Sequence, residues 1–570
     1  MANGLDSFTP FDFSRIQGIY SPLDQDYEEE EEAAMKGKQQ EYVPSFSMEE
    51  WGEQIYPSSF GYGTYNKYKD QEQPPISNCS TLDEFFSSCS PAPAKPMQEV
   101  KESENIAKFK DLSSSLELLN NYSIKKLNVN QFNNVSSGPK KLSTEEIMRI
   151  AGARYIQFSD QRFDDFSTLM HPYGYALSGL SGEETKNVEL AHLLFAAAEK
   201  VGYQQFDRAS RLLSRCEWIA SEGANPVQRV VHCFAEALRE RIDKATGRLF
   251  VPNVRKESYA VNSNLACISV HQNVPINQVM QLASIQTIME NIGSARKLHV
   301  IDLEIRSGVQ WTAMMQALAD RKHRPIEHLK VTAVGLTSEH KNIEETGRSL
   351  ENFAKSMNIS FIFKAVCVQH MIDIKQELFE TASDESLVVV SNMFLKTLLS
   401  SPECLENLMT VIKSLNPSIM VVTEVEAKHN SPNFVNRFIE ALFFYSAYFD
   451  CLETCLDQNT EHRSTIEAIF CSGIREIVAA DDNGRSVRNV QIDVWRAYFS
   501  RFRMVEIGLS ESSFYQANLV AKQFVYGSSC NLDKNGKCLI VGWKGVPLHS
   551  LSAWKFCRDR LGRFLSNYRF

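Results

Sequence analysis

The 570-residue sequence lacks several features that mark common protein classes. Its thirteen cysteines form no CxxC pair, and the nearest two, Cys451 and Cys455, have no His or Cys partner at zinc-ligand spacing. We therefore expect buried thiols rather than a metal site. The odd cysteine count and the lack of a charged-then-apolar leader favour a reducing, intracellular compartment. No apolar run reaches the length of about 18 residues that a membrane span needs, so a soluble protein without membrane contact is expected.

An excess of basic charge is also missing. The formal net charge is -10 and the isoelectric point is near 5.8, which gives no global attraction to nucleic acid or to an anionic membrane. Any nucleic-acid contact must come from a local basic patch. Sequence motifs of the GxSxG, HExxH and Walker GxxxxGK[ST] types are absent, so the common hydrolase and nucleotide-binding chemistries find no support.

The first part of the chain, residues 1–142, is predicted to be disordered. It is rich in Ser, Pro, Asn, Gln and Glu, includes five consecutive glutamates at 28–32, and shows no sustained helical or strand periodicity. Aromatic residues such as Phe11 and Trp51 lie among the acids. Such a composition suits short, inducible contacts with a partner groove, as in transcriptional activation segments, and equally suits a solubilising tail.

Residues 143–296 are predicted to form a helical cap. The segments 188–201, 206–222 and 225–242 repeat apolar residues at helical spacing. Asn225 is a candidate N-cap, with Pro226 at the first helical position. These segments indicate an all-α layer.

Residues 297–570 are predicted to form an α/β domain, because the pattern changes to alternating strands and helices. The predicted strands are 297–302, 329–335, 360–366, 387–392, 419–425 and 503–508. Continuous apolar strands between helices indicate a parallel sheet covered on both faces. The segments 537–545 and 548–556 predict a closing hairpin with its turn around Pro547, and so an antiparallel edge. The whole describes a Rossmann-like, doubly wound, methyltransferase-like sheet.

The stretch LHVIDLEIRSGVQW at 298–311 resembles the first strand of a cofactor-binding sheet, yet it lacks the glycines that let a cofactor approach the backbone. Residues 303–307 place side chains in that space. The second strand ends at Leu336 without an acid for ribose hydroxyls, and the next acid is Glu339. Catalysis by this route is therefore not expected. Asp302 is expected to accept hydrogen bonds from loop amides or from the N-terminus of the helix with Gln310 and Trp311, the alternative being a ligand contact.

Five motifs in order make the region from about 185 to 570 resemble the GRAS domain of plant regulatory proteins. LHVIDLEIRSGVQWTAMMQALADR is similar to the family's VHIID motif, and the helical segments on either side are similar to its two leucine-rich regions. Later segments are similar to the PFYRE and SAW motifs. The motif residues are His299, Asp302, Gly308, Gln310, Trp311, Pro417, Arg437, Glu440, Arg475, Glu476, Trp543 and Trp554. From the residues alone, His299 is expected to be a satisfied core histidine, and the tryptophans large core side chains.

The resemblance implies a nuclear, non-enzymatic regulator without a cofactor, which contacts transcription factors and other GRAS proteins and forms homo- or heterodimers. The core resembles the DELLA branch, linked to gibberellin signalling, although no DELLA sequence is present near the N-terminus. The family segment WRxRMxxAG is WRAYFSRFR at 495–503, so that Arg503 stands where glycine is expected. A glycine with positive φ is not simply replaced by arginine.

Two sets of residues are candidates for contact with other molecules. The LxxLL pentads can dock in an apolar groove or form an ordinary core stripe; their leucines are Leu190, Leu193, Leu194, Leu395, Leu398 and Leu399. A basic C-terminal patch can hold DNA phosphates or form a solvated face; its residues are Arg485, Arg488, Arg496, Arg501 and Arg503. The leading hypothesis is a transcriptional co-regulator that acts through protein contacts. The alternatives are direct promoter binding and a methyltransferase that uses S-adenosylmethionine.

Overall fold

The computed structural model describes residues 114–119, 141–159, 180–220, 225–248, 259–321, 325–480, 485 and 488–557. Nearly all of the region predicted to be disordered, including the glutamate run at 28–32, lies outside the described residues. Within it, residues 114–119 form a short helix that the sequence did not predict. None of the described helices is long and apolar enough to cross a membrane.

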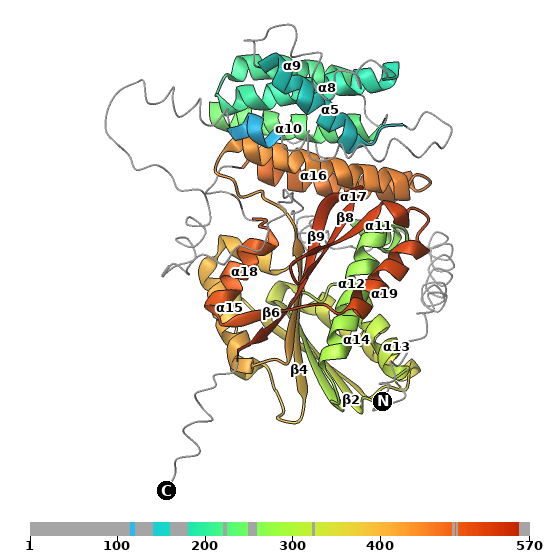
Figure 1. Ribbon diagram of the computed structural model, residues 1–570. Coiled ribbons are helices and arrows are strands. Elements are labelled where there is room, and N and C mark those ends of the chain that lie inside the picture. The colour runs from blue at the N-terminus through green and yellow to red at the C-terminus, as the bar shows by residue number, and fades with distance from the viewer. Residues whose placement is uncertain are drawn as a thin grey trace, which may run out of the picture. The chain divides into compact units, whose positions relative to one another are not determined.

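A layer of helices lies over one end of the sheet (Figure 1). Its members are α5 (Thr144–Ser159), α8 (Gly182–Gly202), α9 (Phe206–Ile219), α10 (Pro226–Thr246), α11 (Tyr259–Asn273), α16 (Phe434–Cys455) and α17 (Thr460–Val478). The predicted caps of α10 are present: the Asn225 side chain accepts a hydrogen bond from the Gln228 amide, and Pro226 opens the helix. Two members, α16 and α17, come from much later in the chain. They pack on α10, a contact that sequence periodicity could not predict.

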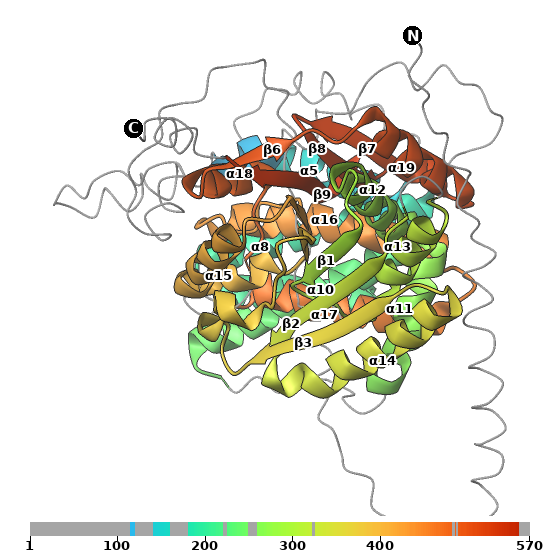
Figure 2. The same cartoon turned by 90° about the horizontal axis from the view of Figure 1, so that it is seen from below.

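The sheet has the doubly wound, mixed form that was predicted. Its described strands are β1 (Lys297–Asp302), β2 (His328–Leu336), β3 (Phe361–Val368), β4 (Ser386–Asn392), β5 (Ile419–Val425), β6 (Met504–Ile507), β7 (Cys530–Asn535), β8 (Cys538–Trp543) and β9 (Val546–Phe556). The order is β3-β2-β1-β4-β5-β9-β8-β7, with β6 paired to β9. The strands from β3 to β5 are parallel, and β9, β8 and β7 form the antiparallel edge (Figure 2).

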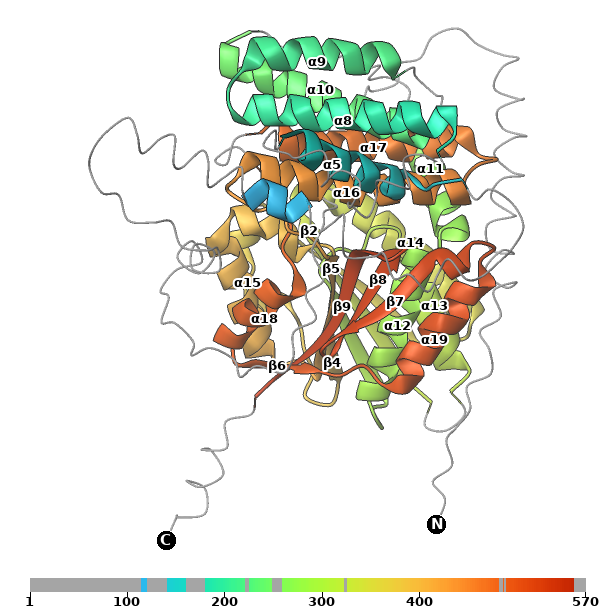
Figure 3. The same cartoon turned by 45° about the horizontal axis from the view of Figure 1, so that its top comes forward.

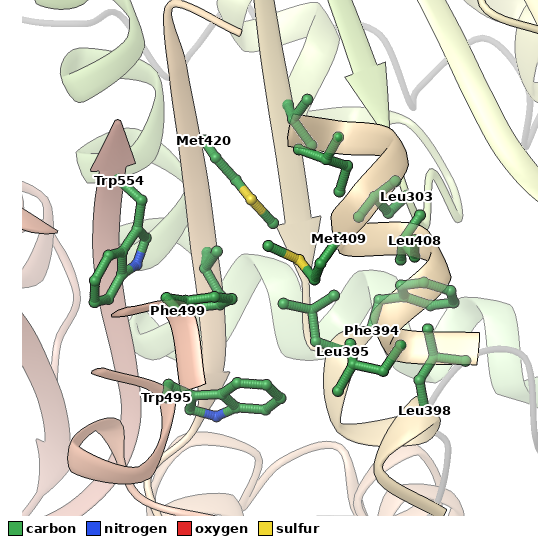
Figure 4. Packing of buried hydrophobic residues seen from close by; sticks show 14 of the residues in the cluster. Leu303, Phe394, Leu395, Leu398, Leu408, Met409, Met420, Trp495, Phe499 and Trp554 are labelled. Carbon is green, nitrogen blue, oxygen red and sulfur yellow. The ribbon is translucent and has the colours of Figure 1, made fainter. Parts of the chain in front are cut away.

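Helices cover both faces of the sheet. On one side lie α12 (Pro275–Asn291), α13 (Val309–Ala319), α14 (His340–Ser356) and α19 (Glu511–Gln523), and on the other α15 (Pro402–Leu415) and α18 (Ile492–Arg501) (Figure 1). The core on the α15 and α18 side joins Met409, Met420, Trp495 and Trp554, all at most 2% exposed (Figure 4). Burial of large side chains from several strands and helices fixes the register of the sheet and so the positions of the strand ends.

The predicted turn around Pro547 is wrong. The turn between β8 and β9 consists of Lys544 and Gly545, both with positive φ (45° and 84°), which a two-residue hairpin turn requires and proline cannot adopt. Pro547 lies within β9 opposite Gly542, where the register shifts. A bulge of this kind tolerates proline because a ladder hydrogen bond is already missing.

Arg503 does adopt the left-handed conformation that the sequence analysis considered unsuited to arginine. Its φ is 58°, in the turn between α18 and β6, and its amide donates to the Ser500 carbonyl at 2.9 Å. The side chain is exposed. The chain therefore keeps the turn at the expense of backbone strain of about 1 kcal/mol.

The expectation that all cysteines are thiols is wrong for one pair. Cys233 of α10 and Cys471 of α17 form a disulfide, with their Cα atoms 5.2 Å apart. They are separated by 238 residues, so spacing along the chain gave no sign that the two helices bring them together. The described cysteines elsewhere are free, Cys451 and Cys455 among them.

Candidate functional site at the crest of the sheet

The carboxyl ends of β1, β4 and β5 lie side by side and form the crest of the sheet, the place where enzymes of similar architecture bind ligands. We use the word crest for Asp302, Glu304, Lys396, Glu424 and Glu426. These side chains are largely or wholly buried. The crest is thus where a cofactor would have to bind.

Asp302 ends β1 and is fully buried. One carboxylate oxygen accepts from the Glu304 amide at 3.0 Å, and the other accepts from Gln310 Nε2 at 2.8 Å and Trp311 Nε1 at 2.7 Å. The donors are thus a loop amide and, from the first turn of α13, the side chains of Gln310 and Trp311, in agreement with the expectation for Asp302. Burial raises the pKa of Asp302 to about 6, and these hydrogen bonds limit the rise. The carboxylate fastens the strand to the loop and to α13.

The loop from 303 to 308 fills the space in which a cofactor would approach the backbone. Leu303 and Ile305 are at most 4% exposed and point into the core. Arg306 and Gly308 both have positive φ (50° and 67°), so the loop turns sharply. A Cβ on Gly308 would lie 2.9 Å from Thr346 Cγ2, which means that this glycine serves packing against α14 rather than access for a ligand.

Charged groups from three strands meet at the crest. Lys396, in the 3-10 helix after β4, and Glu424, in β5, are 2% and 1% exposed, and the Lys396 amide donates to Glu424 Oε1 at 3.3 Å. Burial lowers the pKa of Lys396 to about 7 and raises that of Glu424 to about 7, while each partner's charge opposes the shift. Arg306 and Glu304 also act on Lys396, which links the pair to β1. The charges compensate one another within the protein.

Glu304 and Glu426 extend this network. Arg306 Nε lies 3.4 Å from Glu304 Oε1, and burial raises the pKa of Glu304 to about 7 against this attraction. Glu426 follows β5 and accepts from the Ile492 amide at the start of α18 at 3.1 Å. Burial raises the pKa of Glu426 to about 8. A carboxyl group at a helix N-terminus is ordinarily stabilised as an anion, so here burial outweighs the helix dipole.

The helical layer is fastened directly over this end of the sheet. Tyr448 of α16 forms a hydrogen bond with His549 of β9, both buried. Asp450 of α16 accepts from Trp543 Nε1 at 2.8 Å and forms an ion pair with Lys544 at 2.7 Å. The crest is therefore filled from within by its own side chains and tied to α16 from above.

The other motif residues lie in the interior or in intramolecular pairs. His299 is buried, with Nε2 at 2.8 Å from Thr332 Oγ1, and burial lowers its pKa to about 4, so the ring is neutral. Arg437 donates to the carbonyls of Ile477 and Ser431. Arg475 pairs with Glu240 at 2.7 Å. The remaining motif positions are Pro417 and Glu440, which are buried, Glu476, which is partly exposed, and Trp554, which is in the core.

The leucine pentads form core stripes, one of the two roles that their spacing predicted. Leu190, Leu194, Leu395, Leu398 and Leu399 are at most 7% exposed, and Leu193 is partly buried. The second pentad lies in a 3-10 helix rather than an α-helix. Neither pentad presents a free leucine face, so docking of a partner groove on them is corrected to a packing role.

The five C-terminal arginines are mostly engaged within the chain. Arg485 is 5% exposed and donates to the His429 carbonyl at 2.9 Å. Arg496 forms a two-pronged pair with Glu506, and Arg501 pairs with Glu406 at 3.0 Å. Arg488 is partly buried and Arg503 is exposed. Contact of these residues with phosphates stays a prediction.

Sequence reasoning missed Lys396, Glu424 and Glu426. The signal was present, because IMVVTEVEA at 419–427 places two glutamates in an otherwise apolar strand. Lys396 lies within the second leucine pentad, which was interpreted only from the spacing of its leucines. Among the described residues, no group of three or more His, Cys, Asp or Glu side chains is placed to hold a metal ion.

Comparison with known proteins identifies relatives over the same region. The sequence model of the GRAS domain family matches residues 190–555. DELLA protein RGL1 of Arabidopsis thaliana is 30% identical over 382 residues, 66% of this chain and 72% of the relative. DELLA protein GAI1 of Vitis vinifera is 29% identical, over 66% of this chain and 63% of the relative. The crystal structure of SCL7 of Oryza sativa aligns with a TM-score of 0.57 at 24% identity, covering 64% of this chain and 99% of that one.

Proposed function

Because the chain belongs to the GRAS domain family of plant transcriptional regulators, we propose that it acts in the nucleus as a co-regulator that binds transcription factors and performs no catalysis. The observation that supports this most is the crest. Its space is occupied by Leu303 and by a self-compensated set of buried charges, so the architecture of a cofactor-binding sheet serves as a rigid frame.

A partner needs a surface, and helix α9 offers one. Its inward face buries Ala209, Leu213 and Cys216, while Trp218 near its end is 86% exposed. Beside it, Glu217 pairs with Arg239 of α10. An exposed tryptophan next to a charged pair is typical of a binding hot spot with a polar rim. We assign the first contact with a partner protein, including a second GRAS protein, to this face.

The test is purification of the tagged full chain from plant nuclei, comparing wild type with Trp218→Ala. Tyr515→Ala on α19 is the matched control, because Tyr515 is also aromatic and 62% exposed. We expect transcription factors to co-purify with wild type and Y515A and to be reduced about tenfold with W218A, the scale of a hot spot of roughly 1.4 kcal/mol. Equal recovery with all three proteins would remove the assignment to α9, and recovery of no transcription factor would remove the co-regulator proposal.

The acidic, aromatic N-terminal region is proposed to engage the transcription machinery. Residues 1–140 fused to a neutral DNA-binding domain should change the output of a reporter gene. An unchanged output would remove this part of the proposal.

Direct DNA contact is the alternative, and the exposed Arg503 beside the partly exposed Arg501 is the observation in its favour. Charge reversal at both should lower the dependence of DNA affinity on salt by about two phosphate contacts. Identical salt slopes for wild type and variant would count against DNA contact here. The buried Arg485 is unsuited to this test, since its reversal would also disturb the fold.

A further inference from the structure

The short helix at residues 114–119 lies against three helices of the helical layer (Figure 3, blue). Its sequence is SSLELL, and Ser115 and Leu119, four positions apart and so on one face, are 4% and 1% exposed. The contact surface belongs to helices α5, α8 and α16.

We call this surface the notch; it is lined by Gly152 and Tyr155 of α5, Phe195 and Ala198 of α8, and Phe438 of α16. A Cβ on Gly152 would lie 2.7 Å from Leu119 Cδ1, so the absence of a side chain there makes room for the leucine. The cavity left between segment and notch is only about 10 Å³. The Leu119 side chain is therefore closely packed in the notch.

A polar contact fixes the register of the segment. Ser115 Oγ donates to Asn436 Oδ1 at 2.7 Å, and Asn436 Nδ2 donates to Ser114 Oγ at 3.1 Å. Asn436 lies in the first turn of α16, where its amide donates to the N-cap Asn433. One amide side chain thus recognises two adjacent serines, which a chance apolar contact would not provide.

The segment fills only part of the available space. Beside Ser114 and Glu117 an adjoining cavity of about 190 Å³ is lined by Lys428, Ser431 and Glu440. A six-residue helix is too short to be stable alone in water, so docking must supply the free energy that orders it. These features describe a segment that binds weakly and whose docking depends on its being part of the same chain.

We propose that the notch is a peptide-docking site whose ligand is the chain's own segment 114–119, which is released as a unit. Docking anchors the N-terminal region to the helical layer. Release leaves the folded domain intact and frees both the N-terminal region and the notch. Because the ligand belongs to the same chain, docking is intramolecular, and a modest intrinsic affinity suffices for it.

The test uses a fluorescent peptide of residues 110–123 and full-length proteins, with binding followed by fluorescence anisotropy. In one protein, Leu119→Asp disables the chain's own segment; in a second, residues 114–119 are replaced by a Gly-Ser segment of equal length, which leaves every residue of the notch unchanged. If the notch is closed in ten of eleven wild-type molecules, the apparent affinity for added peptide rises about tenfold in both variants. Adding Asn436→Ala to either should reverse the gain.

The control peptide has the same composition with the residues at positions 115 and 119 exchanged, which places leucine against Asn436. It should bind at least about tenfold more weakly. The proposal is overturned if neither variant binds the peptide, if wild type binds as tightly as the variants, or if the control peptide binds equally well. Retained binding after Asn436→Ala would also overturn it, because the serine contacts would then have no part in recognition.

Discussion

The crest and the notch are both occupied by the chain's own side chains, but they differ in what holds the occupant. At the crest, Glu424 lies in β5 and Lys396 in the buried 3-10 helix that follows β4, so their groups leave only if the domain unfolds. At the notch, Leu119 belongs to a short helix whose Ser114 and Ser115 form hydrogen bonds with Asn436. The comparison separates a closed site, which serves as structure, from a site that can be vacated without unfolding.

The largest expected effect is at the Lys396 and Glu424 pair. Lys396→Met keeps the volume of the side chain but leaves a buried carboxyl without its cation, and should lower the unfolding free energy by about 3 kcal/mol. Adding Glu424→Gln should restore most of that loss. Urea denaturation of the single and double variants measures the difference. A double variant that loses the sum of both single effects would show that the groups are not coupled, and would break the description of the crest as one unit.

The next effect is at Asp302. Asp302→Asn replaces one acceptor oxygen by an amide that faces the Gln310 and Trp311 donors, so one donor is left unpaired in the interior. We expect a loss of about 2 kcal/mol, measured by the same denaturation. Gln310→Ala is the matched control; it removes a single partly buried donor and should cost about 1 kcal/mol. A variant D302N as stable as wild type would argue that the carboxylate is not a fastening group.

A smaller effect depends on pH. The pKa of Glu426 is raised to about 8 by burial, so the folded protein keeps a proton that the unfolded chain releases. Its contribution to stability is complete below the unfolded pKa of about 4.5 and is lost as pH rises to about 8. Glu426→Gln keeps an acceptor for the Ile492 amide but does not titrate. Between pH 5 and 6.5, wild type should lose about 1 to 2 kcal/mol more of its unfolding free energy than E426Q. The same dependence of stability on pH in wild type and E426Q would contradict the raised pKa of Glu426.

The smallest effect is at the notch. Leu119→Asp expels the segment, and the lost apolar burial and hydrogen bonds are largely offset by the restored freedom of six residues. Global stability should therefore fall by no more than about 1.4 kcal/mol, the free energy of a tenfold preference for the docked form, while hydrogen exchange at 114–119 becomes fast. Thermal unfolding measures the change in stability, and hydrogen exchange on the same sample measures the release of residues 114–119. A large drop in stability would make the segment part of the core and would erase the contrast with the crest.

The sheet could be predicted closely because its strands are continuous apolar runs bounded by turns. The observed β1 and β5 begin and end at the predicted residues. The turn was predicted around Pro547 because proline is common in turns. The residues with positive φ that form it are Lys544 and Gly545, just before this proline. The crest's donors to Asp302 were named in part, yet Lys396 and Glu424 were not, since burial of a charge is decided by neighbours distant in sequence.

The helix at 114–119 could not be predicted either, because its conformation depends on contacts that are distant in sequence. Six residues carry too weak a periodic signal to distinguish a helix from a loop, and their conformation depends on docking to α5, α8 and α16. The disulfide between Cys233 and Cys471 likewise depends on the approach of α10 and α17, because the two cysteines are separated by 238 residues in the sequence.

The most direct test of the central claim, that the crest is closed by its own side chains, is a calorimetric titration of the full-length protein with S-adenosylmethionine. The ligand is the cofactor that a sheet of this architecture would hold at that place. We predict only the heat of dilution, for wild type and for E426Q alike. Saturable binding at one molecule per chain, weakened by substitution of Lys396 or Glu424, would contradict the account.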